Sequence, residues 1–220
     1  MGLHAPVADP APRDSTGRVM LALRTINRRE FLAVPASTDE GGFSSLDLDR
    51  VAHLLRATGG EEHPMDPRVV DLVYRIQAHF DAPEIRVVSG YRAPTPGSHS
   101  NHGRGRAVDL VVPAAMDEDV AEFVRGLGFV GVGIYPAGQF VHVDIRPHSY
   151  FWVDFSRPHA SNREHGILRD LAIKSDAQAL AQGRDPIEPF AIAGDVDAAL
   201  GAYASASTPA TSNEEEDDDP

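Results

Sequence analysis

Ionisable residues that could bind a metal ion lie inside two short apolar segments of this sequence. Asp109 occupies the middle of segment 107–112, and His142 and Asp144 lie in segment 140–145. Both segments are rich in valine and predict β-strands, in which alternate side chains share a face. A carboxylate in the middle of such a strand is costly to bury unless a cation or a metal compensates its charge. These groups therefore indicate a site rather than plain sheet packing.

His102 lies just before the first of these strands, in the sequence SHSNHGRGR. Gly103 and Gly105 permit a tight turn, which would place His102 at the end of the strand that carries Asp109. Neutral histidine and ionised aspartate both bind zinc, at roughly 2.0 to 2.2 Å. Three protein ligands with a fourth position left to water form the arrangement that lowers the pKa of bound water to about 7. Each residue alone is more often structural, but His102, Asp109 and His142 together form a candidate zinc site.

The amino-acid composition excludes several kinds of site and partner. The chain has no cysteine, which excludes thiol catalysis, cysteine–zinc sites and disulfides. Any zinc site must then use His, Asp, Glu and water, a ligand set more typical of catalytic than of structural zinc. The net charge is -13, and the run Glu214–Asp219 is wholly acidic. Because no basic patch is visible, we expect no nucleic-acid partner.

No apolar run approaches the roughly 18 residues that a membrane span requires, so we expect no membrane span. The first residues lack the charged and apolar regions of a secretory signal. Either the protein is cytoplasmic or its export signal lies outside this chain.

Three helices should position the candidate site. Apolar residues recur at helical spacing over residues 46–58, directly after Ser44 and Ser45. A second helix should begin at the cap Asp66, with proline in its first position, and bury a stripe that ends at Phe80. A third, shorter helix is expected over residues 117–128, which end in glycine-rich sequence.

Short Val- and Ile-rich segments predict the strands: 85–89, 107–112, 132–135 and 140–145, with one or two more over 18–34. The connection 136–139 favours an antiparallel hairpin. We therefore expect an α+β fold, in which helices pack on one face of a small antiparallel sheet.

The domain organisation follows from composition. Residues 1–15 read as a loose arm and residues 16–157 as the domain. Residues 158–203 form a more polar extension, with helices expected over 162–182 and 196–203. Residues 204–220 are rich in Ser, Thr and Ala and then acidic, so we expect disorder there.

The sequence resembles the LAS-type zinc peptidases, the D-alanyl-D-alanine metallopeptidase group, over about residues 46–153. It is most similar to the bacterial YcbK-like murein endopeptidases, and the helix MDPRVVDLVYRI fits that branch. The resemblance implies a hedgehog and D-Ala-D-Ala peptidase-like fold. The pieces that carry it are Ser100-x-His102-x-x-Gly105-x-Ala107-x-Asp109-Leu110, the run Val88-Ser89-Gly90-Tyr91-Arg92, the run Gly131 to Pro136, and Phe140-Val141-His142-Val143-Asp144.

The resemblance implies that His102, Asp109 and His142 bind one Zn²⁺ per chain. It implies that Arg92 binds a substrate carboxylate or stabilises the oxyanion of the tetrahedral intermediate. Ser100 would orient a ligand or the loop backbone, and Tyr91 would lie behind a ligand or contact substrate. The implied substrate is peptidoglycan peptide, cut by an endopeptidase or a D,D-carboxypeptidase. We expect a monomer in the cell envelope or periplasm.

The general base is the residue for which the sequence offers alternatives. Carboxypeptidases of the group have a glutamate three residues before the last ligand, where this chain has Gln139. An amide cannot take a proton from water, so Asp144 is the candidate base, and its alternative role is to orient a ligand histidine. His99 and His148 are further candidates, each more easily explained as a surface histidine.

Three functions compete. The first is a zinc peptidase acting on peptidoglycan. The second is a peptidoglycan-binding module that holds zinc but has lost its base, as Gln139 suggests. The third is a purely structural domain whose His and Asp residues only form hydrogen bonds. Zinc content and turnover would distinguish them.

Overall fold

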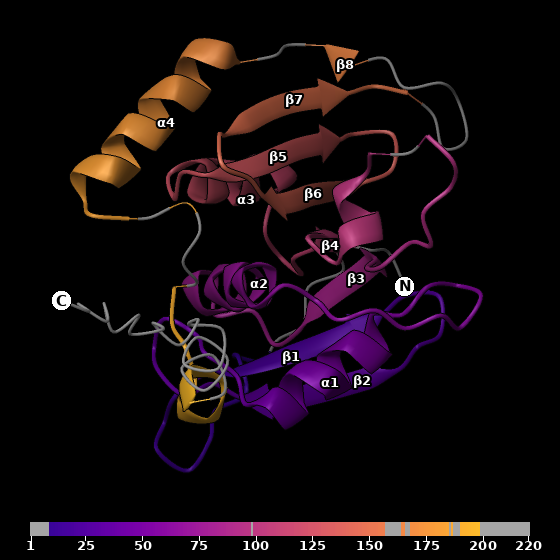
Figure 1. Cartoon of the computed structure of the whole chain (residues 1–220), viewed down its shortest axis with the longest axis vertical. Coiled ribbons are helices and arrows are strands. Elements are labelled where there is room, and N and C mark those ends of the chain that lie inside the picture. The colour runs from indigo at the N-terminus through magenta and orange to yellow at the C-terminus, as the bar shows by residue number, and fades with distance from the viewer. Residues whose placement is uncertain are drawn as a thin grey trace, which may run out of the picture.

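A single eight-stranded sheet forms the centre of the structure, a computed structural model that describes residues 9–97, 99–156, 164–165, 168–184, 186 and 190–198. The strands lie in the order β2-β1-β3-β4-β6-β5-β7-β8, which Figure 1 shows from bottom to top. Their bounds are β1 Met20–Thr25, β2 Phe31–Pro35, β3 Ile85–Ser89, β4 Ala107–Val111, β5 Val130–Tyr135, β6 Phe140–Ile145, β7 Tyr150–Asp154 and β8 Glu164–His165.

The sheet is mixed. The pairs β1–β3 and β5–β7 are parallel, and the other neighbouring pairs are antiparallel. The α+β class is confirmed, and so is the hairpin of β5 and β6, but the sheet is larger than the small antiparallel one expected. The difference arises because β1 pairs with β3, which is distant in sequence, and β7 pairs with β5 rather than with the preceding strand β6. Local patterns of alternation do not reveal such pairings.

Among the elements with assigned bounds in the described residues are the α-helices α1 Ser45–Leu54, α2 Pro67–His79, α3 Asp117–Arg125 and α4 Arg169–Ala181. All four contribute residues to the hydrophobic core. Ser44 caps α1 and Asp66 caps α2 through hydrogen bonds to backbone N–H groups, and the cap at Asp66 is the one that the sequence predicts. Within the described residues, every helix is too short or too polar to cross a membrane.

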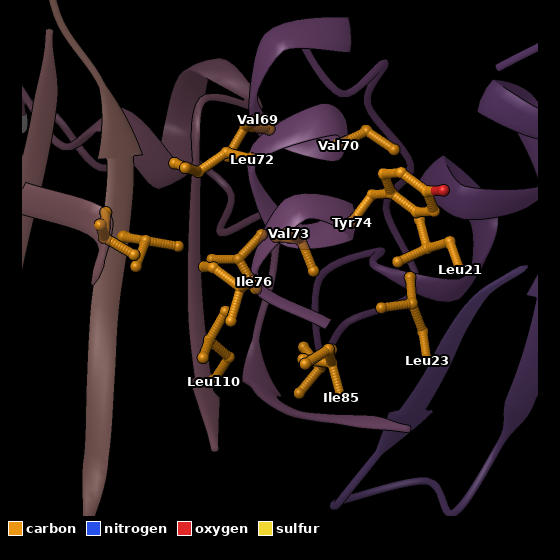
Figure 2. Close-up of a cluster of buried hydrophobic side chains, with 14 of the residues drawn as sticks. Leu21, Leu23, Val69, Val70, Leu72, Val73, Tyr74, Ile76, Ile85 and Leu110 are labelled. Atoms are coloured by element: carbon orange, nitrogen blue, oxygen red, sulfur yellow. The ribbon is translucent and has the colours of Figure 1, made fainter. Parts of the chain in front are cut away.

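The core lies between these helices and the sheet. Figure 2 shows the apolar side chains of α2 directed at those of β1, β3 and β4. Strand residues of the core alternate with those of the opposite face, so Val108 and Leu110 point to the helices while Asp109 points away. The burial of one face thus fixes which face presents the ionisable side chains. The labelled core residues are Leu21, Leu23, Val69, Val70, Leu72, Val73, Tyr74, Ile76, Ile85 and Leu110.

Several expectations fall partly or wholly on residues outside the described ranges. These include most of the expected arm at 1–15, the expected disorder at 204–220, and most of the expected helix at 196–203. In the extension, the helix expected over 162–182 corresponds to α4, which begins at Arg169.

A buried aspartate on α2 ties two distant loops to this helix. Asp71 is 1% exposed, and its two carboxylate oxygens accept hydrogen bonds from the backbone N–H groups of Gly42 (2.8 Å) and Ala191 (3.3 Å). Burial raises the pKa of Asp71 to about 6, although these hydrogen bonds oppose the shift. The carboxylate is therefore held in its charged form at a cost.

We expect this aspartate to make the stability pH-dependent. A folded-state pKa above the unfolded value means that the folded chain binds the proton more tightly, so stability falls as pH rises from about 4 to about 6. Relative to Asp71→Asn, the wild-type chain should lose about 3 kcal/mol of unfolding free energy over that interval. Urea denaturation at a series of pH values measures this difference. A difference that does not change with pH would contradict the prediction.

Candidate metal centre

Three buried side-chain atoms from different elements converge on the face of the sheet opposite the helices. The Nε2 atom of His102 lies 3.2 Å from Oδ1 of Asp109 and 3.2 Å from Nδ1 of His142. The third side of the triangle, from His142 Nδ1 to Asp109 Oδ1, is 2.8 Å. Asp109 and His142 are directly opposite each other in the β4–β6 pair, which explains how strands separated in sequence bring them together.

The loop before β4 positions His102. A short 3₁₀ helix, η1 Asn101–Arg104, carries this residue, and the hydroxyl of Ser100 accepts a hydrogen bond from the backbone N–H of His102 (3.3 Å). The Nδ1–H group of His102 donates to the backbone carbonyl of Gly90 (2.7 Å). In the neutral ring, this bond leaves the lone pair of Nε2 directed at the other two residues.

Asp144 and Arg146 hold His142 in a similar way. The Nε2–H group of His142 donates to Oδ2 of Asp144 (2.9 Å), so its Nδ1 atom faces Asp109. Asp144 is fully buried and accepts two hydrogen bonds from the guanidinium of Arg146 (2.6 and 2.7 Å). Asp144 therefore lies behind His142 rather than among the three converging atoms. Arg146 was missed by the sequence reasoning, although an arginine two residues after a buried aspartate on an expected strand is a detectable signal.

The pKa values reflect this network. Burial alone would lower the pKa of His142, but hydrogen bonds to Asp109 and Asp144 raise it to about 9. Burial opposes ionisation of both aspartates, yet the neighbouring histidines lower the pKa of Asp109, and His142 and Arg146 lower that of Asp144. The site thus favours two carboxylates and an added cation, which can be a proton or a metal.

The donor set fits a zinc ion. With each histidine donating from its outer nitrogen, the three inward atoms all present lone pairs to one another, an arrangement that requires a cation between them. Ligands of a tetrahedral zinc ion lie roughly 3.3 to 3.5 Å apart, close to the observed 2.8 to 3.2 Å. Among the described residues, these three are the group of His, Asp and Glu side chains that could hold a metal.

Arg92 lies at the entrance of the site. Its guanidinium donates from Nη2 to Oδ2 of Asp109 and from Nε to the hydroxyl of Ser89 (2.8 Å). The side chain of Arg92 is 53% exposed although the carboxylate that it contacts is buried. This combination leaves part of the guanidinium available to an incoming group. Its neighbour Tyr91 stacks on the ring of His63 at a centroid separation of 4.9 Å.

The other residues considered for the general base differ from the three donors in burial: His99, Gln139 and His148 are exposed. Gln139 has a left-handed backbone (φ 56°) and ends the turn between β5 and β6.

Two glycines of β5 make room for the side chains around His142. A Cβ atom on Gly131 would lie 2.2 Å from a carboxylate oxygen of Asp144, and one on Gly133 would lie 2.3 Å from the ring of Trp152. Trp152 is 4% exposed and lies 5.2 Å from the ring of His142. Both glycines belong to the run Gly131 to Pro136, whose sequence alone does not reveal the side chains that they accommodate.

We expect Gly133→Ala to destabilise the protein. Neither the buried Trp152 ring nor the paired strands can move away, so overpacking should cost about 1–3 kcal/mol of unfolding free energy. Urea denaturation measures it. Gly59→Ala is the matched control, because a Cβ at Gly59 meets nothing within 4 Å. Equal stability of the two variants would show that the ring is not fixed as described.

The fold and the site together define a class: an α+β domain with a buried His–Asp–His group on the open face of its sheet. The sequence family described as peptidoglycan L,D-endopeptidase MepK matches residues 13–151, and this chain belongs to that family. The membership confirms the resemblance to LAS-type zinc peptidases of the YcbK-like murein endopeptidase branch.

Individual relatives of this chain carry the same family name. A Haemophilus influenzae protein named probable peptidoglycan L,D-endopeptidase MepK is 31% identical, over 65% of this chain and 81% of the relative. The Escherichia coli K12 protein named peptidoglycan L,D-endopeptidase MepK is 24% identical, over 65% of this chain and 82% of its own length. No solved structure matches the chain.

Proposed function

We propose that this chain is a zinc-dependent endopeptidase that hydrolyses peptide bonds in peptidoglycan stem peptides or cross-links. The observation that carries the proposal is the convergence of His102, Asp109 and His142, each with its outer atoms already held by other groups. The family and its named relatives support the substrate class and the endopeptidase type. They give no support to the carboxypeptidase alternative.

Each residue has a role that follows from its contacts. His102, Asp109 and His142 would hold the metal, which when bound supplies a Lewis acid and a water of lowered pKa. Arg92 orients Asp109 and presents the rest of its guanidinium to a substrate carboxylate or a developing oxyanion. Ser100 positions the backbone of His102. Asp144 orients His142, since its carboxylate is engaged by that ring and by Arg146.

A second candidate function is a zinc-containing module that binds peptidoglycan without cutting it. Gln139 stands where a base is expected, and Asp144 is paired behind His142, so neither supplies a base beside the three donor atoms. This alternative predicts one zinc ion per chain and tight binding of peptidoglycan, but no turnover.

One experiment separates these possibilities. Zinc content and cleavage of purified muropeptides should be measured for the wild-type chain, for the chain treated with a chelator, and for His102→Ala. The peptidase proposal expects about one zinc per chain, loss of cleavage on chelation and its recovery when zinc is restored. Stoichiometric zinc without cleavage would support the binding module. An inactive, metal-free wild-type chain would overturn both.

A further inference from the structure

A pocket outside the metal centre lies between the start of α2, the end of η1 and the segment 190–198. Its volume is about 450 Å³, and none of the three metal-site residues lines it. Phe43, Met65 and Val196 contribute to an apolar lining, while arginine side chains supply the charge. The pocket adjoins the loop of His102, because two of its arginines flank Gly105, the residue that ends η1.

The pocket carries an excess of positive charge. Three guanidinium groups line it, from Arg68, Arg104 and Arg106, with a single carboxylate, that of Asp66. Asp66 binds Arg68 through both oxygens (3.0 and 2.7 Å) and lies 3.4 Å from Nε of Arg106. One carboxylate cannot neutralise three guanidinium groups, and Arg104 is exposed. Guanidinium groups bind carboxylates in a planar, two-bond geometry, so the pocket suits an acidic peptide.

A second pocket with several arginines, of about 390 Å³, is a weaker candidate. It is lined by Arg28, Arg56 and Arg92. Both Arg28 and Arg56 donate hydrogen bonds to Glu30, and Glu61 also lines the pocket. Arg92 is already paired with Asp109. The charge of this second pocket is therefore largely balanced by the protein itself.

We infer that the acidic segment Glu214–Asp219 of this same chain binds in the first pocket. The segment 190–198 already lines the pocket through Ala191, Ile192, Ala193 and Val196, so the chain leaves the described region beside it. Residues 199–213 then span up to roughly 50 Å at 3.3–3.6 Å per residue, which makes the pocket accessible.

Electrostatics favour this occupant. The net charge of -13 includes the six carboxylates of the run, so the rest of the chain carries -7 and on average repels the run, whereas the three arginines of the pocket attract it. A tethered partner also acts at an effective concentration of about millimolar, far above that of a free peptide. Binding would place the acidic segment on Arg104, in the same 3₁₀ turn as His102.

A fluorescent peptide of residues 210–220 tests the inference. It is titrated with the full chain and with a full-chain variant whose acidic run is neutralised by Glu→Gln at 214–216 and Asp→Asn at 217–219. The neutralised chain should bind the peptide about tenfold more tightly than wild type, because the wild-type pocket is occupied by its own segment. Raising the salt from about 0.05 M to about 0.5 M should weaken binding at least about fivefold.

Variants of the pocket locate the binding. In the chain with the neutralised acidic run, Arg104→Gln should lower the affinity for the peptide at least about fivefold. Arg106→Gln is the second variant if Arg104→Gln does not fold. Arg50→Gln on α1 removes the same charge from an exposed arginine outside the pocket and should change nothing. Equal binding to the wild-type and neutralised chains, or no effect of the pocket arginines, overturns the inference. The inference is also overturned if a soluble stem peptide binds in a manner that depends on Arg104 while the 210–220 peptide does not bind. The pocket would then be a substrate site. None of these readouts requires peptidase activity.

Discussion

The Asp109→Asn variant is expected to bind no zinc at micromolar concentrations of the free ion. Its rate of muropeptide cleavage should be at least about 10³-fold lower than that of the wild type. The amide keeps the size of the side chain but loses the negative charge that the two histidines face at 2.8 and 3.2 Å. It also loses one of the two acceptor oxygens, which are shared between the donor triangle and Arg92. Metal analysis after dialysis and steady-state cleavage rates measure both effects.

Asp39→Asn is the matched control for this substitution. Its side chain is 90% exposed and forms an ion pair only with the partly buried Arg18 among the ion pairs of the described residues, so zinc content and activity should match the wild type. An Asp109→Asn protein that keeps one zinc ion and activity within about tenfold of wild type would place the third ligand elsewhere.

Replacing Asp144 by Asn distinguishes the two roles that the sequence left open. If Asp144 orients His142, zinc affinity should fall about 10- to 100-fold, and activity should recover when zinc is supplied in excess. If Asp144 is the general base, zinc affinity should stay nearly unchanged while kcat falls by about 10² or more at every zinc concentration. The buried ion pair with Arg146 leads us to expect the first result.

Competition with a chromophoric chelator gives the zinc affinity, and cleavage rates at saturating zinc give kcat. Arg146→Gln serves as the companion variant, because it leaves the carboxylate in place but removes its ion pair. It should weaken zinc in the same direction and by a smaller factor. A loss of kcat that zinc does not restore in Asp144→Asn, with Arg146→Gln unaffected, would contradict the orienting role.

Local features of the fold were predictable because neighbouring residues determine them. Ser44, Asp66 and Pro67 mark helix starts through capping and a fixed φ angle, and these helices begin where expected. The strand over 85–89 has its predicted bounds. The order of the sheet was not predictable, since the parallel pairing of β1 with β3 and of β5 with β7 depends on contacts distant in sequence.

The candidate site also has features that the sequence predicts and features that it does not. Alternation along each strand correctly separated Asp109 from the core residue Leu110, and His142 with Asp144 from the core residue Val143, because the period of a strand is fixed. The direct pairing of Asp109 with His142 depends on register, which the residues of neither strand specify alone. The spacing of Arg146 from Asp144 is visible in the sequence, but the space that lets the two side chains pair is not, because it is left by Gly131 on the adjacent strand.

The pairing of Asp109 with His142 across β4 and β6 also bears on how the chain folds. A slip of one residue between these strands would turn one of the two side chains toward the helices and replace it with Leu110 or Val143. Misaligned strands would then lack a complete set of donors and could not gain the free energy of metal binding. Bound zinc would thus stabilise only molecules in which β4 and β6 pair in the correct register. Molecules with a shifted register would gain no such stabilisation and would unfold and refold more readily.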